Sequence, residues 1–96
     1  MTAAAERVQH DPGRRFTISF EGGVAVLEYR TLDGGATLDY YHTFVPPALR
    51  GRGLASELTS FALRHALERR LKVVPTCPFV AAYIRGHREF ESVLAG

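Results

Sequence analysis

The sequence has few residues that could crosslink the chain or anchor it in a membrane. It contains one cysteine, Cys77, so no disulfide can form within the chain, and a lone thiol suits a reducing compartment. No uninterrupted apolar run approaches the roughly 18 residues of a membrane span, and no secretory hydrophobic region follows Met1. We therefore expect a cytoplasmic protein with no membrane partner.

Several ligand-binding signatures are also missing. The chain lacks Gly-x-x-x-x-Gly-Lys-Ser/Thr and Gly-x-Gly-x-x-Gly, which argues against the common nucleotide-binding loops. No group of His, Cys and acidic residues has metal-ligand spacing, so we expect no metal site. Aromatic and basic residues are not interleaved, so we do not expect a nucleic-acid partner.

The composition is that of one ordinary globular domain, with 96 residues, 46% of them apolar and 23% charged. The net charge of +2 is unevenly divided. Residues 1–48 carry four Arg and six acidic residues, whereas residues 49–96 carry eight Lys or Arg and four acidic residues. This bias favours an anionic ligand on the C-terminal half, although scattered solvated arginines would give the same count.

The first half of the chain predicts an antiparallel meander of three strands. Alternating apolar residues indicate strands over 16–20, 24–30 and 36–45, separated by the turns Glu21-Gly22-Gly23 and Asp33-Gly34-Gly35. The third strand is predicted to place four side chains on one face, those of Leu38, Tyr40, His42 and Phe44. Residues 1–13 have little apolar content and are interpreted as a flexible tail, which leaves 14–96 as a single domain.

The second half predicts a helix, a strand and a shorter helix. Residues 54–71 contain no Gly or Pro and repeat apolar residues every three or four positions, which is typical of an amphipathic helix. A short apolar strand follows over 72–77, and a long crossover helix before it favours parallel pairing with the third strand. Residues 79–86 indicate a final helix. The fold class is therefore α/β in the broad sense (α+β), with helices packed on a mixed sheet.

One short segment joins the two halves and has the composition of a phosphate-binding turn. It is Val45-Pro46-Pro47-Ala48-Leu49-Arg50-Gly51-Arg52-Gly53-Leu54-Ala55-Ser56. Two prolines end the strand, two glycines turn the chain, and the helix begins at once. Backbone N–H groups are unpaired at the positive end of a helix, and two arginines stand beside them, so the segment predicts an anion site. The alternative is that both glycines serve only to turn the chain.

The order of elements and this segment resemble the GNAT acetyltransferase superfamily. The family signature Arg/Gln-x-x-Gly-x-Gly/Ala is matched by Arg50-Gly51-Arg52-Gly53-Leu54-Ala55 at the junction of strand and helix. Two longer stretches are similar to small single-domain GNAT-like proteins (the YjdJ-like group). They are His42-Thr43-Phe44-Val45-Pro46-Pro47-Ala48-Leu49-Arg50-Gly51-Arg52-Gly53 and the run from Lys72 to Ile84. The resemblance covers roughly residues 14–90.

This resemblance implies binding of acetyl-CoA and transfer of its acetyl group to an amine. The glycine turn and the start of the helix would hold the pyrophosphate, and the strand end would hold the pantetheine arm by its main chain. The expected cofactor-binding residues are Phe44, Val45, Arg50, Gly51, Arg52, Gly53, Leu54, Ala55, Ser56, Cys77, Pro78, Phe79, Tyr83, His87 and Arg88.

Two mechanisms follow from the resemblance, and the residues alone do not choose between them. Cys77 is a candidate nucleophile that accepts the acetyl group and passes it on, or else a small buried thiol. In direct transfer, His42 is the candidate base and Tyr83 the candidate acid. His42 packed beside Tyr40, and Tyr83 packed in the core, are the structural alternatives.

The chain lacks most of the structure with which larger GNAT enzymes enclose their acceptor. A tight turn at 21–23 replaces the helices that they have between the first two strands. We therefore expect an open cleft that admits an unidentified amine of a protein, a peptide or a small molecule, in a monomer or weak homodimer. A non-catalytic CoA-binding or protein-interaction module with the same cleft is the alternative function.

Overall fold

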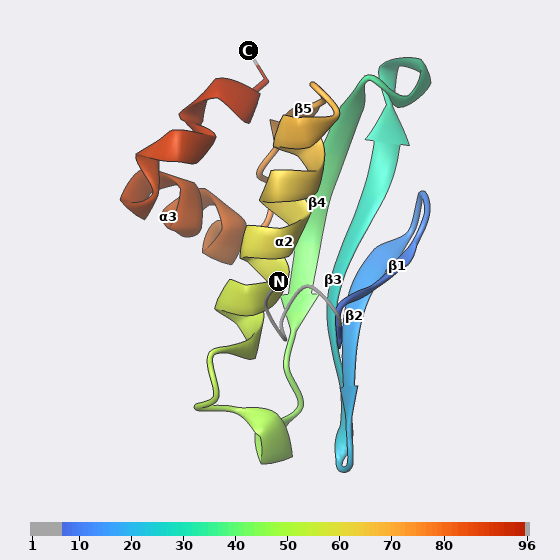
Figure 1. The fold of residues 1–96 in the computed structure, drawn as a ribbon, viewed down its shortest axis with the longest axis vertical. Helices are drawn as coiled ribbons and strands as arrows, with labels where there is room; N and C mark the ends of the chain where they lie inside the picture. The colour runs from blue at the N-terminus through green and yellow to red at the C-terminus, as the bar shows by residue number, and fades with distance from the viewer. Residues whose placement is uncertain (1–6, 96) are drawn as a thin grey trace.

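The computed structural model describes residues 7–95, which form a five-stranded sheet with helices packed on one face (Figure 1). The strand order is β1-β2-β3-β4-β5. Strands β1 to β4 pair with one another in antiparallel fashion, and β5 runs parallel to β4. The strands are β1 (Gln9–Asp11), β2 (Arg15–Phe20), β3 (Gly23–Leu32), β4 (Thr37–Phe44) and β5 (Lys72–Val74). The α-helices are α2 (Leu54–Glu68) and α3 (Pro78–Gly86), and the 3₁₀ turns are η1 (Asp33–Gly35), η2 (Pro47–Leu49) and η3 (Arg88–Val93).

The architecture confirms the predicted α+β class, the antiparallel meander and the parallel strand after the long helix. The long helix ends at Glu68, three residues earlier than predicted. It ends there because Arg70 adopts a left-handed φ of 58°, and the N–H of Leu71 turns back to the carbonyl of Ala66 at 2.9 Å. The following strand is also shorter than predicted and stops at Val74, since Pro75 has no N–H to donate to a ladder.

The prediction of a flexible tail through Gly13 is wrong for its C-terminal part. Gln9–Asp11 form β1 at the edge of the sheet, and Val8 is buried. The His10 ring stacks on Phe16 with centroids 4.2 Å apart and meets the edge of the His65 ring on α2 at 4.7 Å. The apolar content of this segment is low, so its order depends on aromatic partners that are distant in sequence. Residues 1–6, the rest of the predicted tail, lie outside the described residues.

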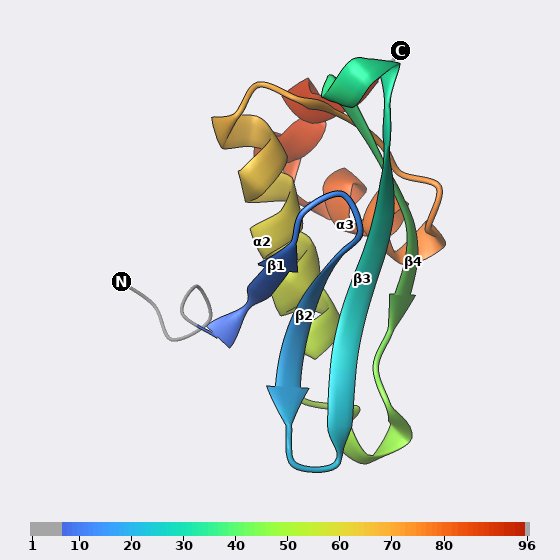
Figure 2. The ribbon, with the colours of Figure 1, turned by 90° about the vertical axis from the view of Figure 1, so that its right-hand side faces the viewer.

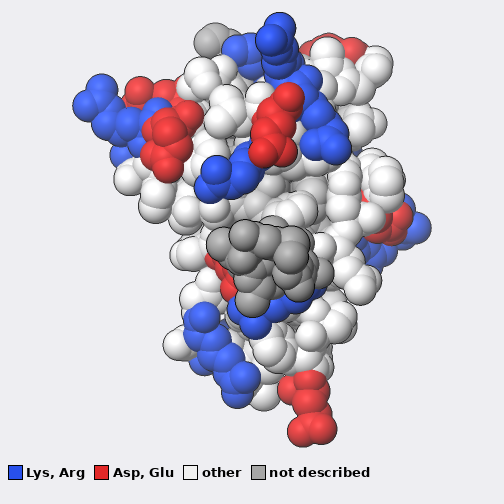
Figure 3. All heavy atoms as spheres, in the orientation of Figure 1, with Lys and Arg blue, Asp and Glu red and all other residues white. Residues whose placement is uncertain are grey.

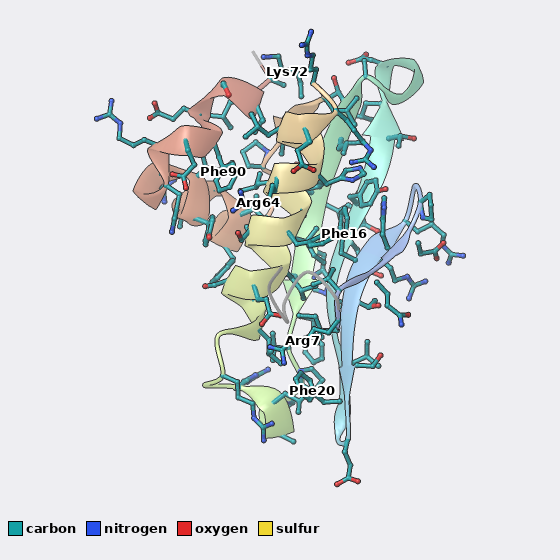
Figure 4. All side chains as sticks on the ribbon, viewed as in Figure 1. Arg7, Phe16, Phe20, Arg64, Lys72 and Phe90 are labelled. Carbon is teal, nitrogen blue, oxygen red and sulfur yellow. The ribbon has the colours of Figure 1, made fainter. Side chains whose placement is uncertain are left out.

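The core lies between the sheet and the helices and is centred on aromatic side chains. Phe16 is fully buried and points from β2 toward α2 (Figure 4), where it meets Tyr29, Tyr40 and Phe61. The hydroxyl of Tyr40 donates to the carbonyl of Ala62 at 2.6 Å and so joins the sheet to α2. The opposite face of the sheet is not covered by any described helix (Figure 2).

A β-bulge in β4 changes which side chains reach the helices. Tyr29 of β3 pairs with Tyr40, but the preceding residue, Glu28, pairs with His42, so Tyr41 is an extra residue in β4. Leu38 and Tyr40 are buried, whereas His42 and Phe44 beyond the bulge are exposed. The prediction that all four share a face is wrong, because one extra residue reverses a period of two.

Within residues 7–95, no helix has the length and the apolar character that crossing a membrane requires.

Candidate functional site

The site is formed where β4 and β5 separate. The two strands pair only from Thr37 to Asp39, and a last hydrogen bond joins the N–H of Cys77 to the carbonyl of Tyr40 at 3.0 Å. Beyond this point β4 continues beside β3 alone, and the chain after β5 turns into α3. The last residues of β4 thus face a gap on the side where a sheet neighbour would lie.

A cleft of about 370 Å³ occupies this gap. It extends from the end of β4 to the first turn of α2, and one side chain of α3 closes its side. Its lining is mostly apolar, which suits the body of an organic ligand rather than a small ion. The lining residues are Thr43, Phe44, Val45, Leu49, Arg50, Gly51, Gly53, Leu54, Ala55, Ser56 and Phe79.

The floor of the cleft at the loop end is exposed backbone. Gly51 and Gly53 have φ values of 83° and 74°, which L side chains rarely adopt. A Cβ atom added to either glycine would meet nothing within 4 Å, so the backbone is open to a ligand here. Gly53 caps α2 without a side-chain bond, and the helix ladder begins with the N–H of Glu57 bonding to the carbonyl of Gly53. The N–H groups of Leu54 to Ser56 thus precede the ladder and carry the positive end of the helix dipole.

Arginines lie beside this helix end (Figure 3). The Nε of Arg50 donates to the carbonyl of Val45 at 2.9 Å, and its guanidinium lies 6.0 Å from the centre of the Phe44 ring. Arg52 does not line the cleft, and its guanidinium lies 5.9 Å from the centre of the Phe20 ring. On the same ring lies Arg7, which forms a two-point ion pair with Glu57 in the first turn of α2 (Figure 4).

Cys77 lies beneath the cleft rather than in its lining. Its side chain is only 7% exposed, and its Sγ lies 3.5 Å from the Oγ1 of Thr43. It immediately precedes α3, whose first residue is Pro78, and the next residue, Phe79, reaches the cleft. The nucleophile candidate thus contacts Thr43 of the cleft lining but does not itself line the cleft.

The remaining candidates lie outside the cleft. His42 is exposed on the sheet face that the helices leave uncovered, with its ring 6.5 Å from that of Phe44. Tyr83 stacks on His87 with ring centres 3.8 Å apart, and Nδ1 of His87 lies 2.8 Å from the carbonyl of Tyr83. That contact requires a proton on Nδ1, because a carbonyl only accepts. Arg88 pairs with Glu91 at 3.9 Å within η3, which follows α3.

Two cleft residues, Thr43 and Leu49, were not expected from the sequence. Strict alternation puts Thr43 on the face opposite Leu38 and Tyr40, and only the bulge brings it to the helix side, opposite the buried Leu27. Leu49 follows two prolines in an irregular loop, where no periodicity predicts burial. Both positions belong to the run from His42 to Gly53 that carries the family resemblance, but that resemblance did not mark them as lining the cleft. Among the described residues no group of three or more His, Cys, Asp or Glu side chains could hold a metal ion.

Comparison with known proteins shows which family and which relatives this chain resembles. The protein family described as GCN5-related N-acetyl-transferase matches residues 15–93. Protein NATD1 of Homo sapiens is 42% identical over 82 residues, which cover 82% of this chain and 72% of that protein. Protein NATD1 of Xenopus tropicalis is 40% identical over 82 residues, covering 82% of this chain and 74% of that protein.

A solved structure has the same fold. The NMR solution structure of a GCN5-like protein from Staphylococcus aureus superposes with a TM-score of 0.72 at 25% identity, covering 99% of this chain and 92% of that chain. The family match extends from β2 through η3 and so includes the splayed strands, the glycine loop and the first turn of α2. The chain belongs to the GCN5-related N-acetyltransferase family.

Proposed function

We propose that this protein is an N-acetyltransferase that binds acetyl-CoA in the cleft between β4, the glycine loop and α2. The observation that carries the proposal is the junction of two features. The strands separate beside an apolar cleft, and that cleft ends on open backbone at the start of a helix. A long apolar arm ending in a pyrophosphate needs both features, and a simple anion needs only the second.

The residues present fit acetyl-CoA as the acyl-donor substrate. The N–H groups from about Arg52 to Ser56 would bind the pyrophosphate, because Gly51 and Gly53 let it approach the backbone. Arg50 and Arg52 would add charge-assisted bonds to the phosphates. The free edge of β4 at Phe44 and Val45 would hold the pantetheine arm. Since Arg50 now bonds to the Val45 carbonyl, we expect its side chain to move when the arm binds there.

Binding of the donor is expected to raise the melting temperature. At a ligand concentration of 100 times Kd, mass action stabilises the folded state by about 2.7 kcal/mol. For a domain of this size that corresponds to a rise of roughly 10 °C. Differential scanning fluorimetry with acetyl-CoA measures it, with adenosine alone as the control ligand because it lacks the pyrophosphate and the arm. A flat response up to millimolar acetyl-CoA would contradict the proposal.

Direct attack by the acceptor amine is the favoured mechanism, because Cys77 is buried behind Thr43. We therefore expect no acetyl adduct on the protein when it is mixed with acetyl-CoA and measured by intact-mass spectrometry. Cys77→Ala should give the same spectrum apart from the change in mass. An adduct of one acetyl group that is absent from Cys77→Ala would instead establish the ping-pong route.

The acceptor is an amine that can reach an open surface. Gly22 and Gly23 close a tight turn between β2 and β3, so no helix among residues 7–95 covers the cleft from that side. A lysine or terminal amine of a protein, or a polyamine, has the reach for such a surface. His42, the base candidate from the sequence, lies on the uncovered sheet face and not in the cleft lining, so we assign the proton of that amine to water instead.

A further inference from the structure

Thr43 has a position in the cleft that no other polar side chain shares. The lining contains three polar side chains, those of Thr43, Arg50 and Ser56. Arg50 and Ser56 belong to the loop and the first turn of α2, where the pyrophosphate is proposed to lie. Among these three, only Thr43 comes from β4, at the end of the cleft nearer to the residues where β4 and β5 pair. In the lining of this cleft it is thus the one hydroxyl at the end away from the phosphates.

The bulge in β4 is what delivers this hydroxyl. Because Tyr41 is the extra residue, Thr43 stands directly opposite Leu27, whose side chain is fully buried toward the helices. Without the bulge His42 would occupy this face and Thr43 would point to solvent. The strand irregularity therefore exchanges an imidazole for a hydroxyl at the cleft.

Cys77 sets the direction of the Thr43 hydroxyl. The thiol lies 3.5 Å from Oγ1 of Thr43, within range of a weak S–H···O bond in which sulfur donates. Cys77 is itself fixed, since its N–H bonds to the carbonyl of Tyr40 and its side chain is buried. A threonine hydroxyl has one proton and two lone pairs, so accepting from the thiol leaves its own proton free to point into the cleft.

We propose that Thr43 donates a hydrogen bond to the sulfur of bound acetyl-CoA and stabilises the thiolate that departs, with Cys77 as the positioning residue behind it. This proposal rests on the proposed function, because it needs the CoA arm to lie along β4. Tyr83, the acid candidate from the sequence, does not line the cleft and stacks on His87. In this proposal Thr43, rather than Tyr83, stabilises the leaving thiolate.

The atoms and electrons of the step balance without a further reactant. The lone pair of the acceptor amine forms a C–N bond to the acetyl carbonyl carbon, and the C–S bond breaks with its electron pair on sulfur. The ammonium proton passes to water. The thiolate keeps its negative charge against the Thr43 hydroxyl until water protonates it, and Thr43 retains its own proton throughout.

The test uses CoA itself, so it does not depend on knowing the acceptor. The thiolate of CoA absorbs in the ultraviolet, and titrating the protein–CoA complex with base gives the pKa of the bound thiol. A hydrogen bond to a charged group is expected to move that pKa by about one to two units. Thr43→Val, which keeps the shape and removes the hydroxyl, should raise the pKa of the bound thiol by this amount. Thr43→Ser should restore the wild-type titration.

Two further measurements separate this role from packing. CoA lacking its sulfur atom should bind equally to wild type, Thr43→Val and Thr43→Ser. Cys77→Ala should give a smaller rise in the thiol pKa than Thr43→Val, and Cys77→Ser, which keeps a donor, should reverse it. An unchanged thiol titration in Thr43→Val would overturn the proposal, as would an equal loss of affinity for CoA and for the sulfur-free analogue. Wild-type protein that binds neither ligand would remove the proposed function as well.

Discussion

Gly53→Val is expected to weaken acetyl-CoA binding about a hundredfold. Gly53 lies at the start of α2 with a φ of 74°, and a Cβ added there would enter open space rather than protein. The valine methyl groups would fill the space through which the pyrophosphate reaches the N–H groups of Leu54 and Ala55. Losing two charge-assisted hydrogen bonds corresponds to about 3 kcal/mol, which is roughly a hundredfold change in affinity. Isothermal titration calorimetry with acetyl-CoA measures the effect.

The chain contains a matched control for backbone strain. Gly34, in the η1 turn at the other end of the sheet, has a φ of 66° and equally open space around its Cβ position. A non-glycine residue in the left-handed region costs roughly 1–2 kcal/mol at either site, so Gly34→Val and Gly53→Val should lower the melting temperature similarly. Only Gly53→Val should weaken the binding of acetyl-CoA. Equal affinities for the two variants would show that the glycine loop is not the phosphate site.

The second large effect is a loss of stability in acid, caused by the histidines between β1 and α2. Burial, together with weaker charge repulsion from Arg69 and His10, lowers the pKa of His65 to about 4. Burial also lowers the pKa of His10, with Arg69 acting in the same direction and Asp11 in the opposite one. Both rings are neutral in the folded protein at pH 7, and Nε2 of His10 lies 2.6 Å from the hydroxyl of Tyr29.

The direction of the pH effect follows from proton uptake. Between about pH 6.5 and pH 4 the unfolded chain binds a proton at His65 while the folded protein excludes it, so stability rises with pH in this window. The lowered pKa of His10 acts in the same direction. The contribution of these histidines to the free energy of unfolding is fully present above about pH 6.5 and is lost as the pH falls toward 4. One pKa unit is worth 1.36 kcal/mol, but both rings are partly exposed, so we expect a total loss of about 1–2 kcal/mol.

Urea unfolding at pH 7.5 and at pH 4.5 measures this loss. His65→Gln should reduce the difference between the two pH values, because the glutamine does not titrate. His42→Gln is the matched control, since His42 is exposed on the uncovered sheet face and away from Arg69. A pH dependence that is unaltered by His65→Gln, or reduced equally by His42→Gln, would contradict the assignment.

These two effects arise from opposite ends of α2. Its first turn presents N–H groups to the cleft and carries Glu57, which pairs with Arg7 ahead of β1. Its last turns carry His65, which packs against His10 of β1. The segment from Arg7 to Asp11 therefore contacts the same helix near both of its ends.

Local chemistry in the sequence was enough to predict most elements and the loop. Gly-Gly turns separate the first strands, the period of α2 continues over four turns, and Pro46 with Pro47 ends β4 at the loop. These signals act within a few residues of each other, so no tertiary information is needed to interpret them. The glycine loop was predictable for the same reason, since its two left-handed residues are both glycine.

The errors at β1 and in the faces of β4 share a cause that lies outside the linear sequence. The order of β1 depends on the packing of His10 against Phe16 and His65, which are 6 and 55 positions away. The bulge at Tyr41 is a property of the pairing between β3 and β4, and it alone decides that Thr43 faces the cleft and His42 faces solvent. Cys77 is similarly placed behind Thr43 by the last hydrogen bond between β4 and the chain after β5.

By itself the sequence determined the family, the order of elements from β2 onward and the glycine loop, because motif, turn and periodicity are encoded in neighbouring residues. Only the tertiary structure decided which side chains reach the end of the cleft away from the phosphates. Strand register and the separation of β4 from β5 depend on contacts between distant segments, and a shift of one residue in such contacts exchanges the two faces of a strand.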